Sequence, residues 1–181
     1  MNVDDPEATH RLADFISRLY GSRSPGAPVV ALCIGTDRST GDALGPLAGT
    51  ELSQHGGRLA RVHGTLDAPV HAANLREILA SIGQSHPRAW VIAIDACLGS
   101  VENVGTIAAG SGPLRPGAGV NKDLPPVGDA YVTGVVNVGG FMEYFVLQNT
   151  RLNLVVRMAK VIAQGVAGAL NRRTLPLTAH P

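Results

Sequence analysis

The fold is organised around residues 29–46, which read Val29-Val-Ala-Leu-Cys-Ile-Gly-Thr-Asp-Arg-Ser-Thr-Gly-Asp-Ala-Leu-Gly-Pro46. The apolar run Val29–Ile34 predicts a buried strand, since continuous apolar runs are typical of strands covered on both faces. The loop Gly35–Gly41 follows with glycines, hydroxyls and an acid, and from Ala43 onward apolar residues recur at helical spacing. Strand, loop and helix in this order predict the first unit of a parallel sheet, with the loop at its carboxyl edge.

The same alternation of strands and helices continues along the chain. Further strands are predicted at residues 58–63, 90–95, 104–108 and 131–136. Helices are predicted at residues 8–20, 43–57, 69–82 and 141–170, the last with a break at Asn149 or Thr150. Because crossover helices join parallel strands and cover both faces of their sheet, this order predicts an α/β protein. We expect a three-layer α/β/α sandwich with a mostly parallel, mixed sheet of about five strands.

Composition favours one domain. The chain has 181 residues, of which 45% are hydrophobic and only 16% charged, and a sheet covered on both sides accounts for so apolar a balance. We therefore expect a single domain over residues 1–181. Within it, residues 1–28 would form an N-terminal helix and linker, and residues 171–181 a frayed tail.

Charge and patterning argue against several classes of function. A net charge of +1 and 4% aromatic residues provide neither a basic surface nor stacking platforms for nucleic acid. No uninterrupted apolar run reaches the roughly 18 residues of a membrane span, so we expect a cytoplasmic protein. Cys33 and Cys97 lie in apolar contexts typical of free thiols in a reducing compartment. A homo-oligomer is compatible with this composition.

Two aspartates stand at the carboxyl edge of the predicted sheet. Asp42 lies just before the second helix and Asp95 ends the strand 90–95, so a right-handed crossover would bring both to one crevice. Two neighbouring carboxylates cannot both ionise cheaply, and a pair that shares a proton can activate water as base and acid. In a purely structural interpretation, Asp42 caps its helix together with Ser39 and Thr40, while Asp95 accepts backbone donors.

Residues in neighbouring loops are candidates for substrate contact: Asp37, Arg38, Lys122, Asn137, Gly139 and Gly140. The two glycines begin a predicted helix, where backbone N–H groups can point toward a scissile carbonyl. Lys122 is either an oxyanion stabiliser or a solvated side chain, and Asp37 with Arg38 is either a substrate contact or an exposed turn.

Two other chemistries are weaker. Cys97 as a nucleophile would need a base such as His63 or His71 from another loop, and a packed thiol is the alternative. The loop Gly35–Gly41 has the glycines of a phosphate cradle, but it lacks the Gly-Lys-Ser/Thr ending of a P-loop and the spacing of a dinucleotide fold.

Together, these motifs resemble the YyaC-type sporulation protein (spore protease) family over about Val29 to Ile162. The resemblance rests on four stretches in order: Cys33–Pro46, Ile94–Gly99, Gly112–Asp123 and Thr133–Glu143. That family is similar to the germination proteases, which degrade small acid-soluble spore proteins, and more distantly to hydrogenase maturation endopeptidases. The resemblance implies a hydrogenase maturation protease-like fold, a protein substrate and a location inside the forespore or spore-forming cell.

The resemblance also assigns residues. Asp42, within Asp-Ala-Leu-Gly-Pro, and Asp95, within Ile-Asp-Ala, match the two catalytic aspartates of the germination proteases. Residues 115–122 are similar to a segment that borders their cleft. In hydrogenase maturation endopeptidases two acids and a later histidine bind a metal, whereas here the corresponding region offers Asn137 and no histidine. We therefore expect neither a required metal nor a cofactor.

The resulting hypothesis is an aspartate-dependent endopeptidase of the germination-protease type. A catalytically silent peptide- or protein-binding sporulation factor on the same fold is the first alternative. A metal-dependent endopeptidase like the hydrogenase maturation proteases is the second.

Overall fold

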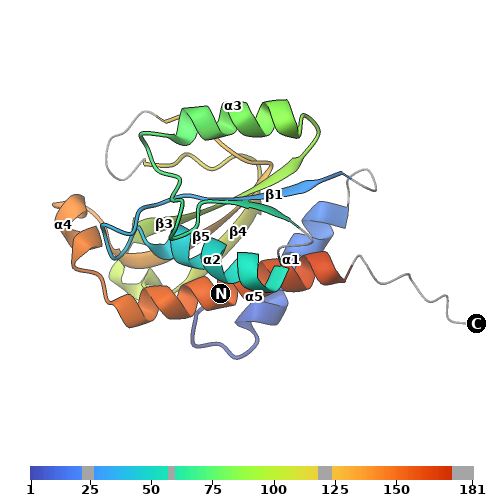
Figure 1. Cartoon of the computed structure of the whole chain (residues 1–181). Coiled ribbons are helices and arrows are strands. Elements are labelled where there is room, and N and C mark those ends of the chain that lie inside the picture. The colour runs from blue at the N-terminus through green and yellow to red at the C-terminus, as the bar shows by residue number, and fades with distance from the viewer. Residues whose placement is uncertain (22–26, 57–59, 118–123, 173–181) are drawn as a thin grey trace, which may run out of the picture.

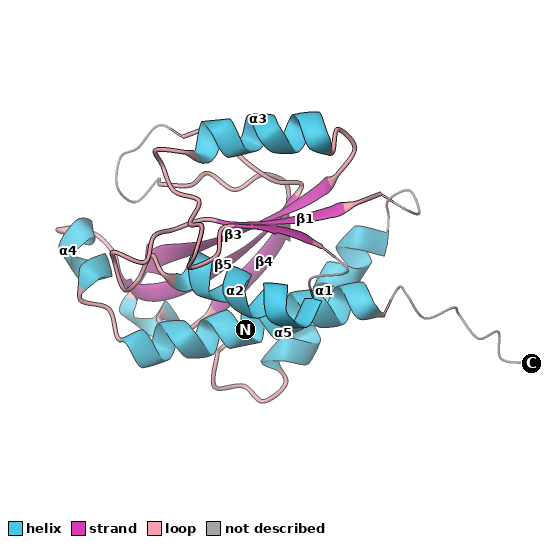
Figure 2. Ribbon diagram, viewed as in Figure 1, coloured by secondary structure: helices cyan, strands magenta, loops and turns pink. Residues whose placement is uncertain are grey.

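The computed structural model describes residues 1–21, 27–56, 60–117 and 124–172, and these form a sheet between two helical layers (Figures 1 and 2). The strands are β1 (Val29–Cys33), β2 (Arg61–His63), β3 (Trp90–Gly99), β4 (Ile107–Ser111) and β5 (Ala130–Val138). Their order in the sheet is β2-β1-β3-β5-β4, and β4 alone runs antiparallel to its neighbour. The predicted three-layer α/β/α sandwich with a five-stranded, mostly parallel sheet is confirmed.

The two helical layers are unequal. The helices are α1 (Ala8–Gly21), α2 (Leu44–Gly56), α3 (Leu75–Ser85), α4 (Glu143–Gln148) and α5 (Leu152–Asn171), with a 3-10 turn η1 (Val101–Asn103). α1, α2 and α5 lie on one face of the sheet, α3 covers the other, and α4 stands at one end of the sheet (Figure 1). Within the described ranges, three helices therefore cover one face, and one helix with loops covers the other.

Both faces of β1 are buried, which explains its continuous apolar sequence. Val29, Ala31 and Cys33 belong to the core shared with α1, α2 and α5, whereas Val30 and Leu32 belong to the core under α3. Alternate side chains of a strand point to opposite faces, so a strand between two helical layers needs apolar residues at every position.

α5 is a core helix. By length and composition it could cross a membrane, with a mean hydropathy of 1.2, yet half of that window is buried inside the protein. Its Gly165 lies so close to α1 that an added Cβ would meet Leu12 Cδ2 at 2.7 Å. The small side chain thus permits tight packing of the two helices.

Several element boundaries differ from those predicted. The helix predicted at residues 69–82 begins only at Leu75, because the preceding turn is closed by hydrogen bonds from His71 N–H to Asn74 Oδ1 and from Asn74 Nδ2 to the Pro69 carbonyl. The strand predicted at 90–95 continues to Gly99, and the strand predicted at 104–108 occupies 107–111. The break predicted near Thr150 is present between α4 and α5.

Some predicted features lie outside the described residues. These are the start of the strand predicted at 58–63, residue 57 at the end of the second helix, most of the linker after the first helix, Lys122 in the long loop, and the tail from 173 onward.

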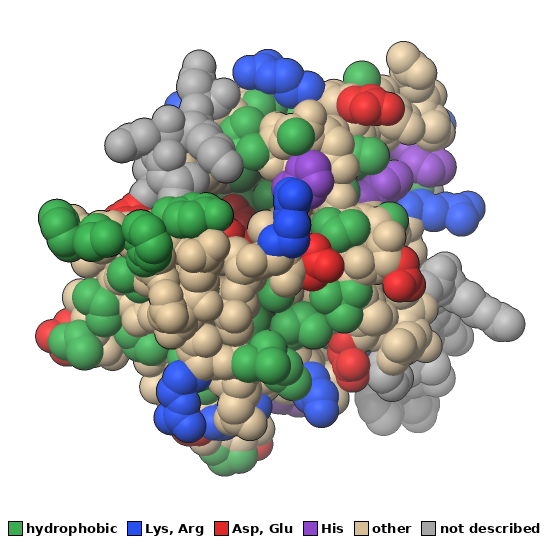
Figure 3. All heavy atoms as spheres, turned by 60° about the vertical axis from the view of Figure 1, so that its left-hand side comes forward, with side chains coloured by type: hydrophobic (Ala, Val, Ile, Leu, Met, Phe, Trp, Pro, Cys, Tyr) green, Lys and Arg blue, Asp and Glu red, His purple; other side chains and the backbone are tan. Residues whose placement is uncertain are grey.

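Large exposed apolar side chains gather near α4 and the adjacent ends of β3 and β5 (Figure 3). They include Val101, Val138, Phe141 and Phe145, each at least 38% exposed. The remainder of the described apolar side chains are mostly buried in the two cores.

Candidate active site

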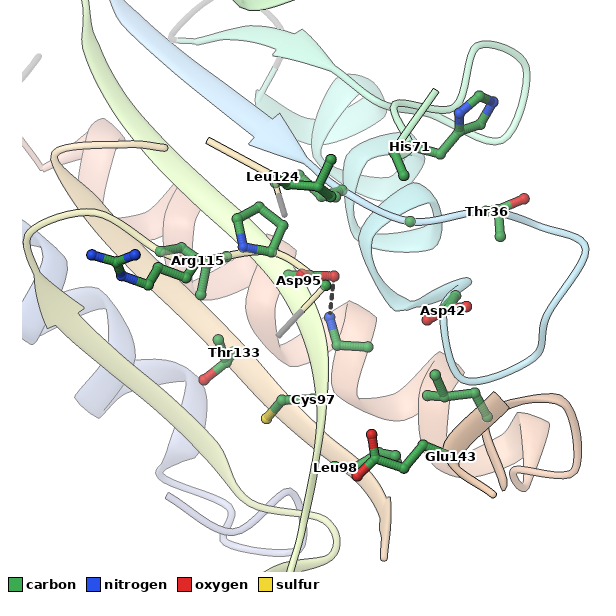
Figure 4. Close-up of a pocket in the computed structure, with 18 residues that line it drawn as sticks. Thr36, Asp42, His71, Asp95, Cys97, Leu98, Arg115, Leu124, Thr133 and Glu143 are labelled. Atoms are coloured by element: carbon green, nitrogen blue, oxygen red, sulfur yellow. Dashed lines mark hydrogen bonds between the residues drawn. The ribbon is translucent and has the colours of Figure 1, made fainter. Parts of the chain in front are cut away.

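A cavity of about 330 Å³ opens at the carboxyl edge of the sheet (Figure 4). Its walls come from the loop after β1, from the turn before α3, from β3 and β5, from the loop after β4 and from α4. The polar side chains among its lining residues are Thr36, Asp42, His71, Asp95, Cys97, Arg115, Thr133 and Glu143. Segments far apart in the sequence thus converge at the edge where parallel α/β sheets bind ligands.

Asp42 reaches the cavity because the loop after β1 folds tightly back on itself. Thr36 N–H donates to the Asp42 carbonyl over 3.2 Å, and Gly35 has a positive φ of 147°. A Cβ on Gly35 would lie 1.9 Å from the Asp42 carbonyl oxygen, and one on Gly45 would lie 2.0 Å from that of Ile34. These glycines are needed because backbone approaches backbone at both ends of the loop.

Asp95 lies within β3 rather than at its end, which corrects the expected position. It points to the same side of the sheet as Ala93, since residues two apart share a face. Ala93 is fully buried in the core under α3, whereas Asp95 keeps partial exposure where the cavity opens. One carboxylate oxygen accepts the N–H of Ala96 over 2.8 Å.

The surroundings of Asp95 shift the pKa of its carboxyl. Burial raises the pKa of the Asp95 carboxyl well above its usual value, the hydrogen bond from Ala96 opposes that rise, and the negative charge of Asp42 adds to it. The protonated form of Asp95 is therefore favoured over a wider pH range than for an exposed aspartate. Such an environment is suited to a carboxylic acid that donates a proton beside a carboxylate that accepts one.

The cysteines are poor nucleophiles in this structure. Burial raises the pKa of the Cys97 thiol, a hydrogen bond with Thr133 opposes the rise, and the charge of Asp95 adds to it. Burial raises the pKa of Cys33 to about 12. Because the thiolate is the reactive form, both environments favour the packed thiol over thiol catalysis.

The candidate substrate contacts in the first loop lie outside the cavity lining. Asp37 and Arg38 are exposed, and Arg38 Nε donates weakly to Thr36 Oγ1 over 3.4 Å. Thr36, one residue earlier, does line the cavity. A role for the exposed pair in binding a longer substrate stays a prediction.

The cavity lining includes neither Asn137 nor the two glycines that follow β5, Gly139 and Gly140. Asn137 Nδ2 donates to the Val146 carbonyl over 3.1 Å and to Thr150 Oγ1 over 3.2 Å, which ties α4 to the sheet. Gly139 N–H donates to the Gly99 carbonyl and Gly140 N–H to Glu143 Oε1. In this arrangement both N–H groups are already used, so contact with a scissile carbonyl would require them to change partner.

Two lining residues, Thr36 and Thr133, were not considered as site residues in the sequence analysis, and His71 was considered only as a base for Cys97. Thr133 pairs with Asp95 across β5 and β3, and a hydroxyl inside an otherwise apolar strand is the signal that could have identified it. His71 lies at the cavity margin and its Nδ1 accepts the N–H of Ala73 over 3.3 Å (Figure 4). Glu143 enters from α4.

The residues present do not fit a metal site of the kind expected for a hydrogenase maturation endopeptidase. Among the described residues, no three His, Cys, Asp or Glu side chains gather closely enough to hold an ion. Asp42 and Asp95 would provide two oxygens, but burial raises the pKa of the Asp95 carboxyl, and the Asn137 amide donates to the Val146 carbonyl of α4. A protonated carboxyl is a poor ligand, because metal binding must displace its proton.

Comparison with known proteins places the chain in a family. A family model described as "Protein of unknown function (DUF1256)" matches residues 1–165. The chain is 57% identical over 145 residues to the uncharacterized protein YyaC of Bacillus subtilis (strain 168), covering 80% of this chain and 71% of that one. The chain therefore belongs to the DUF1256 family, and the YyaC resemblance predicted from its motifs is confirmed.

The fold resembles that of a solved protease. The crystal structure of the [NiFe] hydrogenase maturation protease HycI from Thermococcus kodakarensis KOD1 superposes with a TM-score of 0.53 over 87% of this chain and 99% of that one. At 15% sequence identity this similarity concerns the fold.

Proposed function

We propose that this protein, as a member of the DUF1256 family, is an endopeptidase that hydrolyses peptide bonds with Asp42 and Asp95 as its acid–base pair. One observation carries the proposal: two carboxyl side chains from separate elements line one cavity, where burial raises the pKa of Asp95 and the charge of Asp42 adds to that rise. The protease fold of the structural neighbour and the match of both aspartates to the germination-protease motifs support it.

The environments of the two carboxyls suggest a division of roles. Asp42 acts as the base: its carboxylate takes a proton from water while the water oxygen bonds to the carbonyl carbon. Asp95, whose pKa is raised by burial, donates its proton to the carbonyl oxygen. In the second step Asp42 passes its proton to the amide nitrogen, the C–N bond breaks, and a hydroxyl of the diol returns a proton to Asp95.

The substrate in this proposal is a protein or peptide inside the spore-forming cell. Small acid-soluble spore proteins are the first substrates to test, because the motifs resemble those of the proteases that degrade them. The cavity of about 330 Å³ is large enough for one or two side chains beside a scissile bond, so most of a protein substrate would lie across the surrounding surface.

The decisive experiment is a cleavage assay with matched variants. Purified wild type is incubated with small acid-soluble spore proteins, and new peptide termini are quantified by mass spectrometry over time. Asp42→Asn and Asp95→Asn should each lower the initial rate by about 10²–10⁴-fold, because each removes one proton-transfer partner. Asp67→Asn, an exposed acid outside the cavity lining, is the control and should retain the wild-type rate.

The same assay separates the alternatives. The cleavage rate should fall as pH rises through the pKa of Asp95, because the proposed acid then loses its proton. Equal rates for wild type and both cavity variants would refute the pair. Complete loss of cleavage on adding a chelator would point to a metal-dependent peptidase, and tight binding without cleavage to a silent binding protein.

A further inference from the structure

An exposed apolar surface adjoins the cavity and has no role in the chemistry described above. It consists of Val138, Phe141, Met142, Tyr144 and Phe145, and is called here the α4 platform (Figure 3). Phe141 is 80% exposed, Tyr144 62%, and Phe145 and Met142 each 54%. Contiguous exposed apolar patches of this kind mark interaction sites.

The platform concentrates a scarce residue type. The chain has one Trp, three Tyr and three Phe, and three of these aromatic side chains are exposed within residues 141–145. By contrast, Trp90 is 2% exposed and Tyr20 9%, as expected for core residues. Large aromatic side chains contribute most of the energy in many interfaces, whereas exposing them to water without a partner is costly.

The platform is continuous with the cavity through α4. Glu143 and Leu147, one helical turn apart, line the cavity, while Met142, Phe145 and Val146 line a groove of about 520 Å³ on the other side of the same helix. A chain lying across α4 would therefore touch the platform and the cavity together.

Two hydrogen bonds and an unusual backbone conformation define the turn that carries the platform. Met142 adopts a left-handed backbone with φ 47° and ψ 42°, which is unfavourable for a residue with a side chain. Glu143 Oε1 accepts the N–H of Gly140, and Asn137 bonds the Val146 carbonyl. These contacts define the backbone of the turn that carries the apolar side chains, and a preorganised backbone lowers the entropic cost of binding.

The groove lining specifies the chemistry of the occupant. Its residues are uncharged: Asn137, Val138, Gly139, Phe141, Met142, Phe145, Val146 and Asn149. Glu143 of the same helix lines the cavity instead, and its Oε1 accepts the N–H of Gly140. An acidic segment would find no positive partner among these lining residues, whereas an apolar segment would bury surface against them.

We propose that the α4 platform docks an apolar segment of the substrate polypeptide directly beside the bond placed in the Asp42–Asp95 cavity. The proposal rests on the function proposed above and adds a substrate preference to it: large apolar side chains on one side of the scissile bond. Specificity then comes from α4 and catalysis from the strand-end loops.

The test measures binding separately from cleavage. Two fluorescein-labelled twelve-residue peptides share a neutral Gly/Ser/Ala frame and differ in one block, Leu-Phe-Leu-Val or Ser-Gln-Ser-Thr. Each is titrated with the Asp95→Asn variant and followed by fluorescence anisotropy. The apolar peptide should bind at least about tenfold more tightly, and Phe141→Ser combined with Phe145→Ser should remove that difference.

Leu66→Ser provides the matched control, because it removes another exposed apolar side chain, 37% exposed, that lies outside both the groove and the cavity lining. It should leave the preference intact. Thermal unfolding checks that each variant is folded, and the exposed positions make large losses of stability unexpected.

Each outcome decides between the proposals. Equal affinity for the two peptides would overturn the docking site, even if the wild type cleaves protein. A preference for the apolar peptide without any cleavage by the wild type would retain the docking site and refute the peptidase. A concentration-dependent dimer in sedimentation experiments that the Phe141→Ser/Phe145→Ser variant loses would assign the platform to a second copy of the chain and overturn the proposal.

Discussion

The α3-facing side of the sheet has a sealed part and an open part. Over β1, Val30 and Leu32 are fully buried beneath Leu75 and other residues of α3. Over the later half of β3, side chains on the same face line the cavity, beginning with Asp95. The transition from a fully buried side chain to one that lines the cavity takes place within two residues of β3, from Ala93 to Asp95.

The difference shows how an incomplete layer creates a site. Where α3 covers the sheet, only apolar side chains fit, because an unpaired polar group would lose its hydration. Where the cover ends, Asp95, Cys97 and Thr133 remain partly desolvated but reachable from the cavity. That intermediate environment raises the pKa of the first two without excluding a ligand.

The largest expected effect comes from weakening the sealed part. Leu32→Ala, at a side chain that is fully buried, should lower the free energy of unfolding by about 2–5 kcal/mol, since it leaves a cavity under α3. Thr133→Ala, on the open part, should cost less than about 1 kcal/mol. Urea denaturation measures both, and similar losses at the two positions would contradict the distinction.

The second largest loss of stability is expected at Gly45, whose backbone lies close to that of Ile34 where the loop places Asp42 at the cavity. Gly45→Ala would place a Cβ 2.0 Å from the Ile34 carbonyl oxygen and should destabilise the protein by about 1–3 kcal/mol. It should also slow cleavage, because α2 must shift together with Asp42.

Gly83→Ala is the matched control for that substitution. Gly83 lies in α3 with no atom within 4 Å of an added Cβ, so alanine there should stabilise the helix by about 0.5–1 kcal/mol. Equal changes in unfolding midpoint for the two alanine variants would refute the steric explanation.

Substitution of Asp95 should have a smaller effect and should raise, rather than lower, the free energy of unfolding. Its pKa is raised in the folded protein, so the native state binds the proton more tightly and stability falls as pH rises from about 4 through the folded pKa. Asp95→Asn removes this loss while keeping an oxygen for the Ala96 N–H. The variant should be about 1 kcal/mol more stable than wild type at pH 7, or about 2–4 °C in Tm.

The pH dependence identifies the cause of that gain. The stability difference between Asp95→Asn and wild type should be smallest below pH 4 and grow toward neutral pH. A gain that does not change with pH would show that packing rather than protonation is responsible.

The smallest effect is expected at Cys97. Because burial raises the pKa of its thiol, Cys97→Ala should change the cleavage rate by less than about threefold, and iodoacetamide at pH 7 should react slowly. Rapid alkylation coupled to loss of activity would instead indicate thiol chemistry in the open part.

Much of this arrangement follows from local sequence. The apolar run from Val29 predicts a strand buried on both faces, and the break near Thr150 predicts the division between α4 and α5; both are present. Asp42 and Asp95 could be assigned to one edge, because parallel strands bring their carboxyl ends together. These features depend on periodicity and chain direction, which are properties of the sequence itself.

Other features depend on contacts between distant segments. Thr133 joins the cavity through its register with Asp95, and the N–H of Gly139 is occupied by the Gly99 carbonyl because β3 runs four residues beyond its predicted end. The sequence by itself determined the layers and the two acids. Only the tertiary structure decided that Asp95 is desolvated beside Asp42, because both desolvation and the charge of a partner arise from what lies nearby in space.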